Sequence, residues 1–147
     1  MTACGGPGSR QALYAGGTIP DLGAWTEGVL DTTSEIEIAF RNPRAELAAI
    51  PYSSIVWLEY GREASWRGAG GSVAAKPVGM WPFGLSSGRG RHFLMIVYTD
   101  THGEEQAAMF ELGRDIVRST VSALEARSGK QVLYRDEAAR KQFEATR

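Results

Sequence analysis

The feature that most constrains the fold is a change in the spacing of apolar residues along the chain. In residues 35–41, the side chains of Ile36, Ile38 and Phe40 alternate with other residues and share one face, which is typical of a half-buried β-strand. After residue 113 the spacing lengthens to about three to four residues, the period of an amphipathic helix. Strands followed by one such helix predict an α+β domain, because the helix must bury its apolar stripe against the sheet.

The same patterns locate the individual elements. Strands are expected over residues 26–30, 35–41, 45–50, 52–60, 92–98 and 106–112, with turns at 31–34 and 100–103 that make two hairpins. A helix is expected over residues 114–128, with an apolar stripe of Ile116, Val117, Thr120, Val121 and Leu124. Residues 130–134 are expected to add a short extended piece.

Length and composition predict one domain, over residues 12–135. The chain has 147 residues, 43% of them hydrophobic, which is enough for one core without disulfides. Residues 1–11 are expected to be a flexible N-terminal segment, and the strand pattern begins at Trp25. Residues 136–147 are expected to form a charged helix or tail.

Charge and hydropathy exclude some partners and leave the compartment open. A formal net charge of −1 gives no electrostatic footprint for nucleic acid, so no nucleic-acid partner is expected. No stretch approaches the roughly 18 to 20 apolar residues that span a bilayer, and the chain is expected to be soluble as written. Residues 1–6, which include the single cysteine Cys4, look like the end of a bacterial lipoprotein signal without its apolar part. Cytoplasm and, if a signal peptide has been removed, bacterial envelope both stay open.

Several short runs of residues carry a resemblance to a known family. They are residues 14–18, 50–52, 58–61, 91–94, 106–108, 110–113 and 124–130. In these runs the chain resembles a family of small bacterial proteins of unknown function, of the kind seen in acidobacteria. The resemblance spans roughly residues 14–136 and implies a pleckstrin-homology-like domain, a bent antiparallel barrel or sheet capped by one C-terminal helix. It implies no activity, ligand or catalytic residue.

A Gly-rich insertion at residues 68–90 is the predicted working surface. It carries an apolar and aromatic tip with cations nearby, and the candidate binding residues are Arg67, Lys76, Met80, Trp81, Phe83, Leu85, Arg89 and Arg91. A loop this long is hard to justify as a connector alone. We expect a non-enzymatic binding or scaffolding domain that uses this insertion for a protein partner or for self-association.

Two other interpretations of the insertion stay open. Aromatic residues at headgroup depth beside cations also suit an anionic membrane surface, which makes a peripheral lipid-binding module the alternative function. Alternatively, Trp81 and Phe83 fold back to cover an open end of the barrel. Phosphoinositide binding is not expected, because the predicted first hairpin loop, residues 31–34, is not basic.

Catalytic, metal and cofactor sites are not predicted. His92 and His102 stand near Asp100 and Glu104 in sequence, but a strand separates the two histidines, so they are expected to be ordinary surface residues. No serine has a nucleophile motif around it, and residues 68–71 lack the features of a phosphate-binding loop. An enzyme of unrecognised type is the last alternative.

Overall fold

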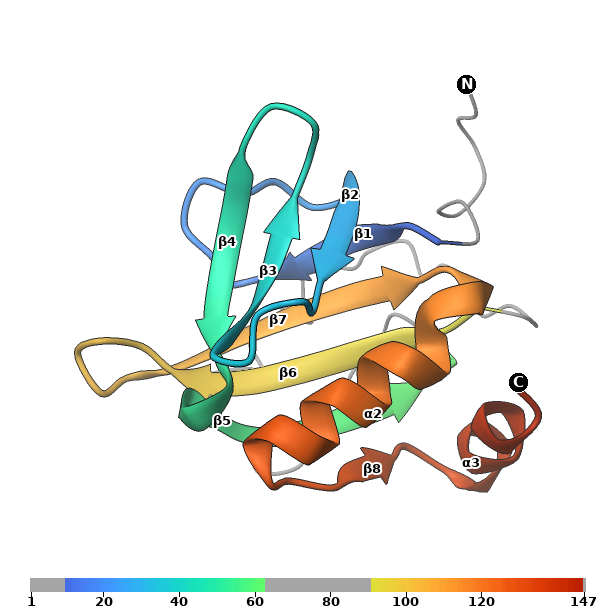
Figure 1. The fold of residues 1–147 in the computed structure, drawn as a ribbon. Helices are drawn as coiled ribbons and strands as arrows, with labels where there is room; N and C mark the ends of the chain where they lie inside the picture. Colours follow the sequence, from blue (N-terminus) through green and yellow to red (C-terminus); the bar gives the residue numbers. More distant parts are fainter. Residues whose placement is uncertain (1–9, 63–90, 147) are drawn as a thin grey trace.

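The computed structural model describes residues 10–62 and 91–146, and their fold belongs to the α+β class (Figure 1). The predictions for residues 1–9 and for the insertion at 68–90 lie outside the described residues. In chain order the strands are β1 (Ala12–Gly17), β2 (Thr26–Asp31), β3 (Glu37–Arg41), β4 (Glu46–Pro51), β5 (Ile55–Gly61), β6 (Phe93–Thr99), β7 (Glu105–Leu112) and β8 (Val132–Tyr134). The α-helices are α2 (Val117–Ser128) and α3 (Glu137–Glu144), and the 3-10 turns are η1 (Tyr52–Ser54) and η2 (Arg114–Ile116).

One eight-stranded sheet contains all of these strands, in the order β4-β3-β2-β1-β7-β6-β5-β8. Every neighbouring pair is antiparallel except β5 and β8, which run parallel. Within the part of the chain that the structure describes, β4 and β8 are the edges, so the sheet is not closed. Helix α2 lies across one face of the β5–β7 half, and α3 lies beside β8 at one end (Figure 1).

Strand β1 was missed by the sequence patterns, although it joins the two halves of the sheet by pairing with β2 and β7. Its first residues are buried on both faces, so its apolar residues do not alternate with polar ones. The strand also ends on Gly17, where φ is +148° and an added Cβ would collide with the backbone of Ala107 and Ala108. Glycine is required there because the backbones of β1 and β7 approach closely, so it does not indicate a loop.

The predicted helix is confirmed, with its first turn as the 3-10 turn η2 and the rest as α2. Its buried residues are Val117, Thr120, Val121 and Leu124, and Ile116 packs against the same core while half-buried. Gly129 ends the helix in the left-handed conformation at φ +77°. No helix of the described residues is long and apolar enough to cross a membrane.

The C-terminal residues form a second helix, so the prediction of a helix or tail resolves to a helix. Asp136 accepts a hydrogen bond from the backbone N–H of Ala139 at 2.8 Å and caps α3. Ala139 and Phe143 are buried against the core. At its other end, Arg118 of α2 donates to the backbone carbonyls of Phe143, Glu144 and Thr146.

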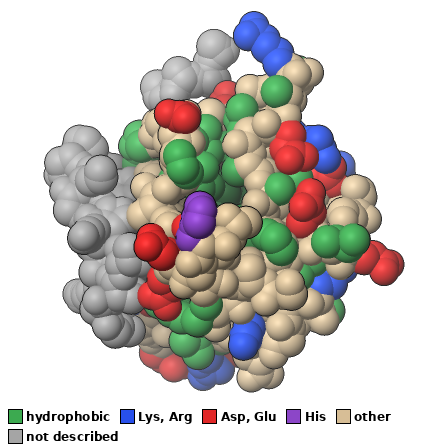
Figure 2. Space-filling model, turned by 90° about the vertical axis from the view of Figure 1, so that its left-hand side faces the viewer, with side chains coloured by type: hydrophobic (Ala, Val, Ile, Leu, Met, Phe, Trp, Pro, Cys, Tyr) green, Lys and Arg blue, Asp and Glu red, His purple; other side chains and the backbone are tan. Residues whose placement is uncertain are grey.

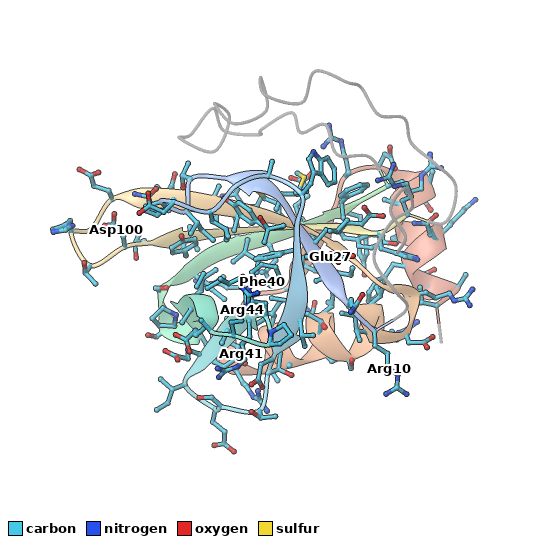
Figure 3. All side chains as sticks on the ribbon, turned by 90° about the horizontal axis from the view of Figure 1, so that it is seen from above. Arg10, Glu27, Phe40, Arg41, Arg44 and Asp100 are labelled. Carbon is cyan, nitrogen blue, oxygen red and sulfur yellow. The ribbon has the colours of Figure 1, made fainter. Side chains whose placement is uncertain are left out.

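The first predicted strand face was partly wrong. Ile38 and Phe40 are buried, and Figure 3 shows Phe40 in the interior between the two halves of the sheet. Ile36, however, is 73% exposed, because β3 begins one residue later, at Glu37. The hydroxyl of Ser34 accepts from the backbone N–H of Ile36 at 3.0 Å, which keeps that residue in the turn.

The sheet has a second apolar face, on the side away from α2. Five consecutive residues of β6, Phe93–Val97, are buried, so both faces of this strand are covered. The second face forms its own apolar cluster, made of Ala15, Phe93, Met95, Val97, Ala107 and Met109, with Trp25, Val56 and Trp57 packed against it. Two buried faces explain why the sequence of β6 reads as a continuous apolar run.

Candidate functional site

The structure describes one of the eight predicted binding residues, Arg91. The other seven, Arg67, Lys76, Met80, Trp81, Phe83, Leu85 and Arg89, lie outside the described residues. Arg91 lies where the chain returns to the sheet just before β6, across from the end of β5, where it departs. Hydrogen bonds and an ion pair link five residues at this end of the sheet, partly through the backbone carbonyl of Arg91, and we call them the root cluster: Tyr60, Arg91, His92, Glu111 and Gln142.

Tyr60, His92 and Gln142 form a buried chain of hydrogen bonds on the side of the sheet that carries α3. The hydroxyl oxygen of Tyr60 lies 2.6 Å from Nδ1 of His92. Nε2 of Gln142 donates to the same hydroxyl at 2.9 Å and to the backbone carbonyl of Arg91 at 2.7 Å. Strand β5, the start of β6 and helix α3 are thereby tied together through three polar side chains.

The donors and acceptors of this chain fix its direction. Gln142 has two amide hydrogens, and both are used, one on the Arg91 carbonyl and one on the Tyr60 oxygen. With one Gln142 hydrogen on the Tyr60 oxygen, the arrangement that gives every polar hydrogen of this chain an acceptor has the Tyr60 hydroxyl donating to Nδ1 of His92. It follows that the neutral imidazole carries its hydrogen on Nε2.

Burial shifts the pKa values of two of these groups so that both stay neutral near pH 7. Burial raises the pKa of Tyr60 to about 12, although the hydrogen bond from Gln142 works against it. Burial also lowers the pKa of His92 below its ordinary 6.5, against the charge of Glu111 and together with that of Arg114. His92 is 5% exposed. The prediction of a surface histidine was therefore wrong at this position.

On the opposite face of the sheet, Arg91 and Glu111 form a two-pronged ion pair. Nε and Nη2 of Arg91 lie 3.1 and 2.9 Å from the two carboxylate oxygens of Glu111. Glu111 is 3% exposed, and it stands directly across the β6–β7 ladder from Phe93. The Arg91 guanidinium also lies over the Phe93 ring, with its carbon 5.2 Å from the ring centroid. A buried carboxylate needs such a partner, since leaving it unpaired is costly.

Apolar contacts complete the attachment of α3 beside the root cluster. The ring of Phe143 meets those of Tyr60 and Tyr134, with centroid distances of 5.3 and 5.7 Å. The guanidinium of Arg118 covers Phe143 from outside, 4.9 Å from the centroid. Helix α3 is short, with eight residues, so these contacts and Gln142 carry most of its hold on the domain.

The two histidines do not come together as a metal site. His92 belongs to the root cluster, whereas His102 is exposed in the turn between β6 and β7. One carboxylate oxygen of Asp100 accepts from the backbone N–H groups of His102 and Glu104, so Asp100 holds that turn. In residues 10–62 and 91–146, no group of three or more His, Cys, Asp or Glu side chains is placed to hold a metal ion.

The sheet edge beside the root is β8, which is three residues long. Leu133 is 54% exposed there and pairs with Glu59 of β5. The carboxylate of Glu125, from α2, accepts from the backbone N–H of Val132 at 2.8 Å and occupies one end of this edge. As far as the described residues go, the exposed part of this edge is short and includes Leu133.

Sequence reasoning missed Tyr60, Glu111 and Gln142 as site residues. Glu111 carried a signal, because it is the one charged residue between Ala107 and Leu112 in a strand otherwise apolar there. Gln142 carried none, since it is 50 residues from His92 along the chain and lies on a helix rich in charge. Only the packing of α3 brings it to the sheet.

The polar groups of the root cluster are hydrogen-bonded or ion-paired to one another. Each of its side chains has a partner within the protein, and no buried side-chain nitrogen or oxygen of the described residues lacks one. Its chemistry is that of a buried anchor at the base of a long segment. In comparisons with known proteins, no family model matches the chain and no curated protein matches it significantly in sequence.

Proposed function

We propose that the chain is a non-enzymatic binding domain with a pleckstrin-homology-like fold. It engages a protein partner, or a second copy of itself, through residues 68–90 and the β8 edge. The contact residues are Arg67, Lys76, Met80, Trp81, Phe83, Leu85, Arg89 and Arg91, with Leu133 on the β8 edge.

The order of the strands supports the pleckstrin-homology-like part of this proposal. Two meanders, β1–β4 and β5–β7, are joined through the pairing of β1 with β7, and the helix that follows β7 packs on the sheet. The β1–β2 connection, residues 18–25, has no Lys or Arg, so the usual phosphoinositide loop is not basic here either. On the face where this connection lies, acidic and hydrophobic side chains mix with a few basic ones (Figure 2).

The observation that carries the proposal is the fixed attachment at the root cluster. The carboxylate of Glu111 accepts a hydrogen bond from the side chain of Arg91, and Gln142 donates one to the backbone carbonyl of Arg91. The backbone N–H of Leu112 donates to the carbonyl of His92 at 2.8 Å. Strand β7 and helix α3 thus converge on residues 91 and 92, which follow the 28 residues 63–90 in the chain. A rigid base lowers the entropy cost of binding through the segment that it carries.

The composition of that stretch favours a protein partner. Trp81, Met80 and Phe83 are the residue types that supply most of the binding energy at protein interfaces, and Arg is enriched there as well. Four cations flank the aromatic tip within the candidate set, at Arg67, Lys76, Arg89 and Arg91. The last of these is already paired with Glu111, which leaves fewer charges for an anionic membrane.

A paired set of variants tests the proposal. Trp81→Ala/Phe83→Ala removes the aromatic tip, and Val29→Ala/Ile36→Ala removes two exposed apolar side chains from the other half of the sheet as a matched control. Self-association is measured by sedimentation velocity over a concentration series. Capture of a partner is measured by a photo-crosslinking residue at position 83, with position 36 as the control. We expect association or a specific crosslink that the first variant loses and the second keeps.

Vesicles separate this function from its alternative. Binding to vesicles with anionic lipid that weakens in high salt and disappears in Trp81→Ala/Phe83→Ala favours the lipid-binding module instead. A wild-type chain that stays monomeric, with equal crosslinking at positions 83 and 36, contradicts the protein-binding proposal. The same variants therefore serve both assays.

A further inference from the structure

His92 is placed where one proton changes the attachment of the C-terminal helix. Its Nδ1 is the final acceptor of the hydrogen-bond chain that starts on Gln142 of α3 and passes through Tyr60 of β5. Both side chains on the sheet side of this chain are buried. We propose that His92 is a proton-operated catch, which holds α3 on the sheet when neutral and loosens it when protonated.

Protonation of His92 changes the number of hydrogens that this chain of hydrogen bonds must accommodate. A proton on Nδ1 points at the Tyr60 oxygen, which then receives hydrogens from both His92 and Gln142. The hydroxyl hydrogen of Tyr60 then loses the acceptor that it has at 2.6 Å when the imidazole is neutral. If the Gln142 amide turns over to accept it, the carbonyl of Arg91 loses its donor, which now lies at 2.7 Å. If the amide turns, α3 loses its hydrogen bond to the Arg91 carbonyl; if it does not, the Tyr60 hydroxyl hydrogen stays unpaired until the opening of α3 admits water. Both cases favour the opening of α3.

The surroundings of His92 determine the direction of the effect. The charged groups that act on it from neighbouring elements are Glu111 of β7, which favours the proton, and Arg114 of η2, which opposes it. Glu111 is already neutralised by Arg91, and α3 itself contributes the uncharged Gln142. Burial is the largest influence and lowers the pKa of His92. Gln142 of α3 lies 3.4 Å from Nδ1, so lifting α3 opens this nitrogen to water, and protonation and release favour each other.

This coupling bounds the size of the response. The equilibrium constant for the release of α3 rises at most about tenfold for each unit by which the pH lies below the ordinary pKa of a solvated histidine, near 6.5. From about pH 7.5 to about pH 5, the opening of α3 therefore increases by up to about thirtyfold. The other strands of the sheet do not bind this proton, and they are expected to stay closed over the same pH range.

Hydrogen exchange tests the catch on the full chain. Exchange of the α3 amides, residues 137–144, is measured at both pH values and corrected for intrinsic rates. The wild type is expected to lose protection in α3 at the lower pH, while β6 and β7 stay protected. His92→Asn places an uncharged acceptor at the same position in the side chain, and its α3 protection is expected not to change with pH. His102→Asn removes the exposed histidine and is expected to respond like the wild type.

A second variant, Tyr60→Phe, keeps the test possible if His92→Asn does not fold. Tyr60→Phe keeps the ring and removes the hydroxyl that protonation leaves unpaired, so its α3 response to pH is expected to shrink severalfold. The catch is refuted if the wild-type α3 shows no change in corrected exchange between the two pH values. It is equally refuted if His92→Asn and Tyr60→Phe keep the wild-type response, or if α3 and the β6–β7 strands open together.

Discussion

Arg127 of α2 lies over the ring of Tyr52, its guanidinium carbon 5.4 Å from the ring centroid, and donates to the Tyr52 hydroxyl at 3.1 Å. The same Nη1 atom also donates to the backbone carbonyls of Thr32 and Ser34, at 2.6 and 3.1 Å. One side chain therefore fastens the end of α2 to the β2–β3 turn and to the 3-10 turn η1. These segments are between 75 and 95 residues away along the chain.

Replacing this arginine is expected to loosen the far half of the sheet. Arg127→Ala should lower the free energy of unfolding by roughly 1 to 2 kcal/mol, since it removes charged hydrogen bonds and a cation–π contact. Arg127→Lys keeps the charge but lacks the planar group, and should recover less than half of the loss. Urea unfolding measures both. Equal stability of wild type and Arg127→Ala would show that the fastening contributes nothing.

The stripe of α2 supplies a larger share of stability. Leu124 is fully buried, and Leu124→Ala should destabilise the domain by about 2 to 5 kcal/mol, because it removes apolar contacts and leaves a cavity. Ser122→Ala on the exposed side of the same helix is the matched control and should change stability by less than about 0.5 kcal/mol. A loss below that limit for Leu124→Ala would mean that the stripe is not core.

The ion pair at the root should show strong coupling. Arg91→Met leaves the buried carboxylate of Glu111 without a partner and should cost about 1 to 3 kcal/mol, a value reduced because Arg91 is itself about 31% exposed. Adding Glu111→Leu removes the stranded charge, so the double variant should be more stable than Arg91→Met alone. A double-mutant cycle in urea gives the coupling energy. Additive losses would contradict the pairing.

Acid should remove the contribution of Asp31. Its carboxylate accepts from the hydroxyl and N–H of Thr33 and from Nε of Arg41, which lowers its pKa from 3.8 to about 2. The unfolded chain binds the proton first, so this stability is present above about pH 4 and lost as the pH falls toward 2. Asp31→Asn should be less stable than wild type at pH 7 and equal to it near pH 2. A nuclear magnetic resonance titration of the carboxyl carbon reads the pKa directly.

Replacing residues 68–90 with a Gly-Asn turn separates a working surface from a structural cover. Under the proposed function the melting temperature should stay nearly unchanged while association is lost. If Trp81 and Phe83 instead cover the domain, stability should fall by several kcal/mol, since each buried large aromatic contributes about 1.5 to 3 kcal/mol. A stable variant that still associates normally would refute the role of this segment. Melting and sedimentation on one protein give both readings.

Local periodicity predicted the elements that have one face in the core. The helix over 114–128 and the hairpin turning at 100–103 have clear patterns, and both are confirmed. The strand at Ala12–Gly17 has no such pattern, because it is buried on both faces and ends on glycines. Ile36 fits the alternation of its strand but is captured by the turn through Ser34. Pattern alone does not tell a turn residue from the first residue of a strand.

The root cluster was beyond the sequence for a different reason. A histidine at a strand start suggests a surface position, whereas His92 is buried and is met at its Nδ1 by Gln142, which helix α3 brings from the end of the chain. The pairing of Arg91 with Glu111 depends on the register of β6 and β7, which no spacing within either strand reveals. Long-range packing determines which residues meet in such a site, whereas local sequence patterns determine where helices and strands form.

The pairing of β1 with β7 has a consequence for how the chain folds. The two meanders become one sheet only when residues 12–17 pair with residues 105–112. The central pair of strands therefore joins segments that are separated by most of the polypeptide. Such a non-local contact slows the search for the native state. During synthesis the first meander emerges from the ribosome with β1 unpaired on one side, and it remains exposed to a wrong neighbour until β7 has been made.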